Sequence, residues 1–348
     1  MILLAARANS VKAITYSRYG PPDVLELSEV RKPVPKDHEV LIRVRAAEAT
    51  KSDCEMRSFR FSVKWFWLPL RIALGVRKPR RQILGGYFSG EIESTGKDVT
   101  TFSVGDQVFG TAGLQLGAYA EYVALSARCA IVAKPKNMSF AEAAAVPLGG
   151  LNALHFMRRA RIRPGEQVLI NGAGGSIGAH AVQIAKSMGA EVTAVDSGIK
   201  EGLLRRIGAD HFVDYTKEGF AGRGETYDVI FDMVPGSSYT GCIGALRPNG
   251  RYLSGNPRLS VMLRAPFTSR FTSKTAIFAF AGETREELLA LKEMIEDGRI
   301  GPIVDRVFPM EQAADAHRLV ETEQRRGAIV IAIDGDAEDA RDRPSARR

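Results

Sequence analysis

The sequence predicts an α/β protein of two lobes, one rich in β-strands and the other a doubly wound domain around a parallel sheet. Its 348 residues are enough for about two domains. Up to about residue 132, short β-rich runs alternate with glycine and proline turns, which is typical of half-buried strands. From about Ser139, alanine-rich helical stretches alternate with buried β-branched runs, which is the pattern of βαβ units.

The elements of the first lobe are expected to be strands, because apolar and polar residues alternate between its turns. They are expected at 11–16, 24–30, 39–50, 88–96, 104–110, 117–125 and 129–135. The end of the chain adds a long helix at 286–298, a strand led by a proline, a helix near 313–320 and a last strand at 328–334. We expect the first lobe to span 11–132 and to be completed by 283–333.

The second lobe is expected over 133–282 and consists of alternating strands and helices. Its strands are expected at 167–171, 191–195, 211–215, 227–233, 251–255 and 276–280. A helix between the first two strands reaches Met188, with Gly189 in the place of a C′ glycine, and the next helix ends at Gly208. The tail, 334–348, is charged and poor in apolar residues, so we expect it to be disordered.

Composition and charge exclude several classes of protein. Hydrophobic residues make up 45% and charged residues 25%, the balance of a soluble globular chain. The net charge of +8 is accounted for by the bases between Arg57 and Gln82, a segment without acids, which argues against a nucleic-acid partner. The chain has no apolar stretch of membrane-spanning length, and its start is too short for a signal peptide. The three cysteines are far apart, which favours a reducing cytoplasm.

The strongest chemical signal is a glycine-rich turn between the strand at 167–171 and an amphipathic helix. The best fit to a dinucleotide-binding pattern starts at alanine rather than glycine, as Ala173-x-Gly175-x-x-Gly178. Glycines let the backbone approach a diphosphate, and the helix N-terminus offers free N–H groups. The residues expected to hold the cofactor here are Ala173, Gly174, Gly175, Ser176, Ile177 and Gly178. The alternative is an ordinary tight turn in an α/β domain.

The residues after the next strand give conflicting signals about the cofactor. Asp196 stands near the spacing at which an acid binds the ribose of NAD. In contrast, Ser197, Lys200 and Tyr215 offer two hydroxyls and an ammonium group that suit the 2′-phosphate of NADP, which Asp196 would repel. The alternative is that Lys200 is a solvated residue of a helix with no role in binding the cofactor.

These motifs carry a resemblance to a known family from about Val11 to Ile333. The chain resembles the zinc-free, quinone oxidoreductase-like branch of the medium-chain dehydrogenase/reductase superfamily. The matching blocks are YGPPDVLEL, ILGGYFSGEIESTGKDVTTFSVGDQVFG, GAYAEYVAL, EAAAVPLGGLNAL, GADHFVDYTKE and DRVFPMEQAADAHRLVETEQRRGAIVIAI. The resemblance implies a GroES-like catalytic lobe, a Rossmann lobe, a cofactor in the cleft between them and reduction of quinones, enones or related carbonyls.

The resemblance also implies roles for individual residues in binding the cofactor. In this branch a lysine and a tyrosine at the positions of Lys200 and Tyr215 accompany a preference for NADPH, while Asp196 departs from the pattern and leaves NADH open. Asn152 and Val234 are expected to contact the cofactor as well. We therefore expect NADP(H), with NAD(H) as the alternative.

The same comparison predicts catalysis without a metal. Zinc-dependent relatives carry a C-x-x-D motif and a G-H-E motif, where this chain reads Thr50-Lys51-Ser52-Asp53 and Gly85-Gly86-Tyr87. Two usual zinc ligands are thus replaced, so no metal site is expected. Thr50 and Tyr87 are the catalytic candidates, because a hydroxyl group can stabilise charge that develops on the substrate oxygen. The alternative is that they are structural hydroxyls of the cleft wall.

Other reactive side chains are given no catalytic role. Cys54 has no histidine nearby in the sequence, so we do not expect it to act as a nucleophile. His155 and His180 fall in helical stretches and are expected to be packing or surface residues.

The basic aromatic segment 59–82 admits three interpretations. It is a flap packed on the lobe, the wall of a hydrophobic substrate channel, or a membrane-surface contact, the last being the least favoured. We expect a small hydrophobic substrate and a homodimer formed through the apolar strand at 276–280. The alternative functions are a zinc-independent alcohol dehydrogenase or ketone reductase and, in another class, a nucleotide-binding scaffold or RNA-binding protein with little turnover.

Overall fold

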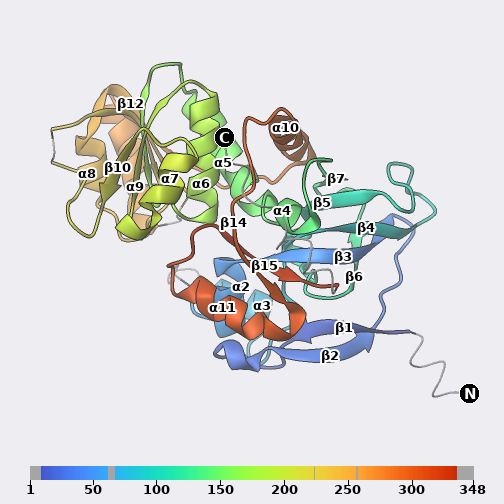
Figure 1. The fold of residues 1–348 in the computed structure, drawn as a ribbon. Coiled ribbons are helices and arrows are strands. Elements are labelled where there is room, and N and C mark those ends of the chain that lie inside the picture. The colour runs from blue at the N-terminus through green and yellow to red at the C-terminus, as the bar shows by residue number, and fades with distance from the viewer. Residues whose placement is uncertain (1–8, 62–66, 223, 256–257, 335–348) are drawn as a thin grey trace, which may run out of the picture.

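The structure is a computed structural model, and it describes residues 9–61, 67–222, 224–255 and 258–334. Figure 1 shows two lobes, each built around its own sheet. Residues 1–8 and 335–348, which include the start of the chain and most of the tail expected to be disordered, lie outside the described residues. Asp334 itself is described, and its carboxylate pairs with Arg43 and Arg45.

The first lobe contains a seven-stranded sheet in the order β14-β15-β3-β4-β5-β7, with β6 paired to β3, and a separate β1–β2 hairpin. Its strands lie close to the expected positions. They are β1 (Ser10–Thr15), β2 (Glu26–Arg31), β3 (Glu39–Ala49), β4 (Tyr87–Thr95), β5 (Gln107–Thr111), β6 (Tyr122–Ser126) and β7 (Ile131–Ala133). Its helices are η1 (Pro22–Val24), α2 (Lys51–Ser58), α3 (Trp67–Leu74), η3 (Gly113–Gln115) and α4 (Phe140–Ala144). Helix α4 packs on β3 and β4, so the first lobe extends past the boundary expected at residue 132.

The second lobe is a six-stranded parallel sheet in the order β10-β9-β8-β11-β12-β13. The strands are β8 (Gln167–Asn171), β9 (Glu191–Asp196), β10 (His211–Asp214), β11 (Tyr227–Asp232), β12 (Leu246–Ser254) and β13 (Thr275–Phe278). The helices are α5 (Pro147–Ala160), α6 (Ser176–Ser187), η4 (Gly198–Lys200), α7 (Glu201–Arg206), α8 (Tyr239–Gly244) and α9 (Leu259–Phe271). Gly189 follows α6 with a positive φ of 83°, as expected of a C′ glycine.

Helices cover both faces of the parallel sheet. Successive side chains of each strand point to opposite faces, so each face has apolar side chains for the helices to cover. Leu154 of α5 and Ile184 of α6 belong to one core cluster, while Cys242 of α8 and Val261 of α9 belong to another. The winding reverses between β8 and β11, and ligands of such sheets bind at the carboxyl ends of the strands at that point. The expected doubly wound α/β class is therefore confirmed.

The end of the chain returns to the first lobe, as Figure 1 shows. Helix α10 (Arg285–Glu296) packs on α5 and β7, and Leu291 joins the core cluster of α5 and α6. After it come β14 (Val304–Pro309), η5 (Met310–Gln312), α11 (Ala313–Glu321) and β15 (Ala328–Ala332). Strand β15 pairs with β3 in the antiparallel direction, so it lies inside the first sheet rather than at its edge.

Three helices were not among the expected elements. Helix α2 directly follows β3 and begins at a capping box in which Thr50 and Asp53 exchange hydrogen bonds. Helix α3 lies in the basic aromatic segment and has no buried residue. Helix α9 contains Pro266 and buries only Val261 and Ala265, so its apolar pattern is weak and its proline argues against a helix.

Candidate active site

The glycine turn lies where β8 passes into α6. Gly172 has a φ of 83°, a conformation that favours glycine. A Cβ atom on Gly178 would stand 2.2 Å from the carbonyl oxygen of Gly172, so only glycine fits there. Gly175 is the N-cap of α6 and no side chain caps this helix. The first N–H groups of α6 are therefore left to a ligand, and the helix dipole favours an anion beside them.

Two further residues expected to contact the cofactor take different positions. Val234 lies over the turn, since its Cγ2 is 3.1 Å from the place of a Cβ atom on Gly172. Asn152 is on α5, where its amide donates to the carbonyl oxygen of Leu148 at 2.9 Å, within its own helix. The structure thus brings Val234 to the turn and leaves the Asn152 amide engaged with the backbone.

Asp196 ends β9 and is held against the glycine turn. Its Oδ2 accepts the N–H of Gly174 at 2.7 Å, and its Oδ1 accepts the N–H of Ser197 at 2.8 Å. Lys200 Nζ lies 3.0 Å from Oδ1, and both side chains of this ion pair are buried. The lysine therefore offsets the negative charge that would repel a 2′-phosphate group.

Tyr215 and Ser197 lie at the same corner of the parallel sheet. The Tyr215 N–H donates to the carbonyl oxygen of Asp196 at 3.2 Å, while the Tyr215 side chain is 62% exposed. The four residues that gave conflicting signals about the cofactor are thus gathered at the carboxyl ends of β9 and β10. A ligand bound at the glycine turn would therefore contact Asp196 and Lys200 as an ion pair.

Thr50 is buried, and its hydroxyl is already engaged. Thr50 Oγ1 donates to Asp53 Oδ2 at 2.6 Å and accepts the Asp53 N–H at 3.0 Å. Asp53 Oδ1 also accepts the N–H of Gly85 at 3.1 Å, which connects α2 to the segment before β4. The neighbouring Ser52 is exposed on α2. The Thr50 hydroxyl hydrogen therefore serves to cap α2.

Tyr87 begins β4 and binds the segment between β13 and α10, where the chain returns from the parallel sheet to the first lobe. Its hydroxyl donates to Glu283 Oε1 at 2.6 Å, and Thr111 Oγ1 donates to Glu283 Oε2 at 3.2 Å. Glu283 lies between β13 and α10. Burial, and after it the charge of Glu283, raises the pKa of Tyr87 well above its usual value. The phenol is therefore neutral across the physiological range and keeps a proton to donate.

The structure brings Cys54 to a histidine that lies far away in the sequence. Cys54 Sγ is 3.4 Å from His317 Nδ1, and Tyr119 Oη is 3.2 Å from His317 Nε2. Burial raises the pKa of Cys54 to about 12 and lowers the pKa of His317 to about 3, with the Arg57 charge adding to the latter. Thiol and imidazole are both neutral, so the pair holds α2 to α11 and supplies no thiolate nucleophile.

The two histidines expected to be packing or surface residues, His155 and His180, both lie in helices and are not exposed. His155 Nδ1 lies 3.2 Å from Glu287 Oε1, which joins α5 to α10. His180 is buried in α6, with its Nδ1 2.8 Å from the carbonyl oxygen of Ser176.

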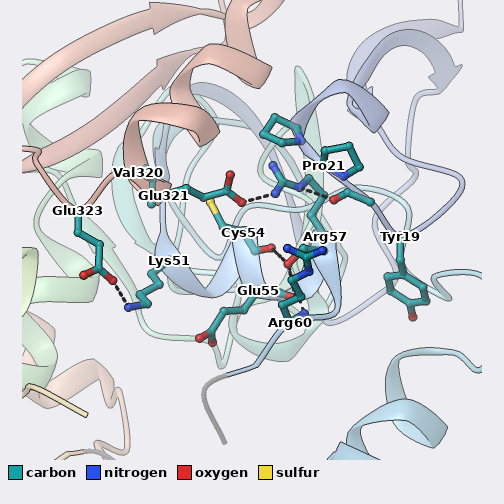
Figure 2. Close-up of a pocket in the computed structure, with 13 residues that line it drawn as sticks. Tyr19, Pro21, Lys51, Cys54, Glu55, Arg57, Arg60, Val320, Glu321 and Glu323 are labelled. Atoms are coloured by element: carbon teal, nitrogen blue, oxygen red, sulfur yellow. Dashed lines mark hydrogen bonds and ion pairs between the residues drawn. The ribbon is translucent and has the colours of Figure 1, made fainter. Parts of the chain in front are cut away.

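A hollow of about 550 Å³ opens on the first lobe between η1, α2 and the end of α11, and Figure 2 shows it. Arg57 crosses its wall to bind Glu321, and Lys51 pairs with Glu323 at its edge. No residue of the glycine turn lines it. It is thus a separate feature of the first lobe.

Charged side chains of the first lobe reach toward the second lobe near α6, and the motifs did not reveal them. The pKa of Glu323 is lowered first by its hydrogen bond with Lys51 and then by the charges of Lys51, Arg325 and Lys200. Because Lys200 belongs to the second lobe, the charges of the two lobes interact here, although Lys51 is paired with Glu323 and Lys200 with Asp196.

The residues present fit a nicotinamide dinucleotide on two structural observations. A Cβ atom on Gly174 would collide with the Lys200 side chain, and one on Gly178 with the backbone of Gly172. The turn therefore needs glycine at both positions to pack this closely on its neighbours. The Ser176 hydroxyl at the start of α6 is buried and makes no hydrogen bond of normal geometry to the described residues. Unmatched buried polar groups of this kind point to a ligand.

The basic aromatic segment is partly packed and partly exposed. Phe59 is buried edge-on against Tyr19, with ring centroids 5.1 Å apart, and the Arg71 guanidinium lies 4.3 Å above the Phe59 ring. Trp67 and Ile72 of α3 are exposed. Residues 62–66 of this segment lie outside the described residues. Among the helices that the structure describes, none has the length and apolar character to cross a membrane.

Comparison with known proteins identifies the family. Residues 36–136 match the alcohol dehydrogenase GroES-like domain, and residues 207–331 match the zinc-binding dehydrogenase family. A quinone oxidoreductase of Pseudomonas aeruginosa is 30% identical, over 92% of this chain and 99% of its own length. The NADPH-dependent alkenal/one oxidoreductase, chloroplastic, of Arabidopsis thaliana is also 30% identical, over 94% of this chain and 81% of its own.

A solved structure agrees with these relatives. The quinone oxidoreductase from Coxiella burnetii has a TM-score of 0.82 and 29% identity, over 93% of this chain and 99% of its own. Its similarity extends over both lobes, so the GroES-like and Rossmann lobes implied by the resemblance are confirmed. The chain therefore belongs to the medium-chain dehydrogenase/reductase superfamily, as an oxidoreductase like the quinone oxidoreductases.

Proposed function

We propose that this protein reduces quinones or activated C=C bonds, with a nicotinamide dinucleotide bound at the glycine turn. The observation that carries the proposal is the uncapped start of α6 at the switch point of the parallel sheet, beside Asp196 and Lys200. Relatives named quinone oxidoreductase and alkenal/one oxidoreductase support it. When bound, the reduced nicotinamide supplies a hydride, and the chain supplies positioning and hydrogen bonds.

Tyr87 is the proposed donor to the substrate oxygen on which charge develops. Its raised pKa keeps the phenol protonated, and Glu283 fixes its orientation. Donation requires the phenol to exchange its hydrogen bond with Glu283 for one to the substrate. Thr50 is the weaker catalytic candidate, because it is only 3% exposed and its hydroxyl both donates to and accepts from Asp53 as the cap of α2.

The preferred cofactor is proposed to be NADPH, with NADH bound less tightly. Lys200 offsets the charge of Asp196, and Ser197 and Tyr215 stand at the same corner of the sheet. This arrangement supports NADPH, because a cation and two hydroxyls near the end of β9 suit the 2′-phosphate of a dinucleotide whose diphosphate binds at α6. Fluorescence titration with both dinucleotides tests the preference, and a lower dissociation constant for NADH would overturn it.

The reaction is proposed to proceed without zinc. No group of three or more potential metal ligands occurs among the described residues, and Thr50 and Gly86 stand where zinc-dependent relatives carry ligands. The matched family description names zinc, so the point needs a direct measurement. Elemental analysis showing one tightly bound zinc ion per chain would overturn it.

A panel of substrates tests the proposed activity. NADPH oxidation is measured with a set of quinones, enones and simple ketones at pH 7. Turnover of quinones or enones supports the proposal. Turnover restricted to ketones would favour a zinc-independent alcohol dehydrogenase or ketone reductase. Dinucleotide binding without turnover would favour a scaffold or RNA-binding role.

We propose a homodimer formed along β13, together with α9. β13 is the edge strand of the parallel sheet, and an unpaired edge invites pairing with a second copy. Leu263, Phe267 and Phe271 of α9 are exposed beside it. Light scattering should give twice the chain mass, and Phe267→Asp should shift the protein toward monomer. A monomeric wild-type protein at micromolar concentration would overturn the dimer.

A cytoplasmic location is proposed on the state of the thiols. Cys54, Cys129 and Cys242 are all free, which suits a reducing compartment. Localisation of a tagged protein by fractionation tests this, and recovery with an oxidising compartment would contradict it.

A further inference from the structure

A register shift in β3 turns one acidic side chain toward the second lobe. The shift occurs between Val44 and Ala46 where β3 pairs with β4. Val44 before it and Ala47 after it both belong to the core cluster of the first lobe. Since side chains alternate along a strand, the extra residue turns Ala46 and Glu48 to the opposite face. Ala46 packs there in a cluster with Ala144 of α4.

Glu48 and Ser176 are near enough to influence each other, and each has a buried oxygen without a hydrogen bond of normal geometry to the described residues. Glu48 is 2% exposed and Ser176 is 6% exposed. Neither Glu48 Oε2 nor Ser176 Oγ makes a hydrogen bond of normal geometry to the described residues. The Ser176 hydroxyl is nevertheless close enough to act on the Glu48 carboxyl and lower its pKa. A buried polar atom without a hydrogen-bond partner is unfavourable for folding unless a ligand binds it.

We propose that Glu48 and Ser176 form a donor pair for the diphosphate bridge of the dinucleotide, with one hydrogen bond from each side chain. The inference rests on the proposed function, since it needs the cofactor at the start of α6. Glu48 comes from the first lobe and Ser176 from the second, so the cofactor would be held between the lobes. The role requires Glu48 to carry a proton, because an ionised carboxylate would repel the diphosphate and cannot donate.

The surroundings of Glu48 favour its protonated form. Burial raises the pKa of Glu48 to about 8, and the Asp53 charge adds to the rise, while Arg325 and the Ser176 hydroxyl act in the opposite direction. Tyr87 and Tyr119 also face it, and both phenols stay neutral because their pKa values are well above normal. Glu48 is therefore mostly an acid at pH 7 and can donate.

Linkage gives the sign of the pH dependence. A diphosphate beside Glu48 stabilises its acid form, so binding raises the pKa of Glu48 further. By reciprocity, the dinucleotide binds more weakly as the pH rises through about 8, where free Glu48 loses its proton. Between the pKa values of the free and the bound protein, binding takes up one proton.

The test measures dissociation constants of NADH and NADPH between pH 7 and pH 9 for the wild-type protein and Glu48→Gln. For the wild type, the dissociation constant should rise above pH 8 by up to about tenfold per pH unit. The amide of Glu48→Gln donates but does not titrate, so affinity at pH 7 should change less than about threefold and stay constant with pH. Calorimetry at pH 8.5 in buffers of different ionisation enthalpy should show proton uptake by the wild type alone.

Glu166→Gln is the matched control, because Glu166 pairs with Arg251 near the amino end of β8, away from the glycine turn. It should keep the pH dependence of the wild type. Equal pH dependence in the wild type and Glu48→Gln would overturn the inference, as would the absence of proton uptake by the wild type, which needs no variant to fold. A wild type that binds neither dinucleotide at pH 7 would instead overturn the proposed function.

Discussion

Two buried acids of the first lobe, Asp53 and Glu48, are only five positions apart in the sequence, yet their surroundings differ. Asp53 accepts hydrogen bonds from the Thr50 backbone and hydroxyl, the Gly85 backbone and, at 3.4 Å, the Tyr119 hydroxyl. Glu48 Oε2 accepts none from the described residues. Asp53 lies inside the lobe beside His317, whereas Glu48 faces the start of α6.

The difference separates structural groups from groups that await a ligand. Buried polar atoms are nearly always hydrogen-bonded in native proteins, so a satisfied network can be explained by folding alone. The network around Asp53 and His317 needs no ligand. We propose that an anionic ligand completes Glu48, Ser176 and the N–H groups at the start of α6.

The largest expected effect is the loss of stability on substitution of Asp53, the acid whose hydrogen bonds are made within the protein. Asp53→Ala leaves the Thr50 and Gly85 donors buried without an acceptor, so we expect a loss of about 3–5 kcal/mol in the free energy of unfolding. Urea denaturation measures it. Asp106→Ala is the control, because Asp106 binds the Ser103 N–H in an exposed turn and should cost under about 1 kcal/mol. A loss below 1 kcal/mol for Asp53→Ala would contradict the structural role.

Next in size is the effect of Tyr87→Phe on turnover. Without the phenol the substrate oxygen loses its donor, so kcat should fall about 100-fold while the dissociation constant of NADPH stays unchanged. Steady-state kinetics and a binding titration measure the two quantities. Tyr122→Phe, on β6 beside Lys32, should leave both as in the wild type. A kcat within threefold of the wild type would remove Tyr87 from the mechanism.

The pH dependence of the free energy of unfolding tests the buried hydrogen-bond network around Asp53 and His317. The pKa of His317 is about 3 in the folded protein and 6.5 when unfolded, so only the unfolded chain binds a proton between these values. The contribution of His317 to the free energy of unfolding is fully present above pH 6.5. Below that pH it decreases by up to about 1.4 kcal/mol per pH unit. Urea titrations from pH 7 to pH 5 should show a shallower loss for His317→Asn. Equal slopes would disprove the assignment.

The smallest expected effect concerns the choice of cofactor. Lys200→Gln removes the cation beside Asp196, so NADPH should bind about tenfold more weakly and NADH less than threefold, which corresponds to about 1.4 kcal/mol for the 2′-phosphate. Lys186→Gln, which breaks an ion pair with Asp210 elsewhere on the second lobe, is the control and should change neither. An equal loss for both dinucleotides would assign Lys200 to structure alone.

Much of the fold could be predicted because its signals are local. The alternation of residues 39–50 and the turn before Ser176 contain their own strand and helix patterns, and β3 and α6 form there. Helix α9 was missed because Pro266 and its few buried residues hide the helical period. Helix α2 was missed because its start was interpreted as a departure from a zinc motif, although Thr50 and Asp53 have the spacing of a capping box.

The site could be predicted only in part. The glycine turn and Asp196 were found from spacing, since strand, turn and helix are consecutive in the chain. The contact between Cys54 and His317 joins positions 263 residues apart, and no local pattern contains it. Glu48 gave one signal, a lone acid in the run RAAEAT, but the register shift that turns it toward α6 depends on pairing with β4.

The place of β15 in the first sheet determines the order in which the protein can be completed on the ribosome. The first lobe begins with the earliest residues, but β3 pairs with a strand made from Ala328–Ala332, almost the last residues described. The parallel-sheet lobe has all its strands earlier, so it can fold while the nascent chain is still growing. The lobe whose first strands are synthesised earlier must wait until Ala328–Ala332 have been made, and a chain cut before them would leave the edge of β3 open to aggregation.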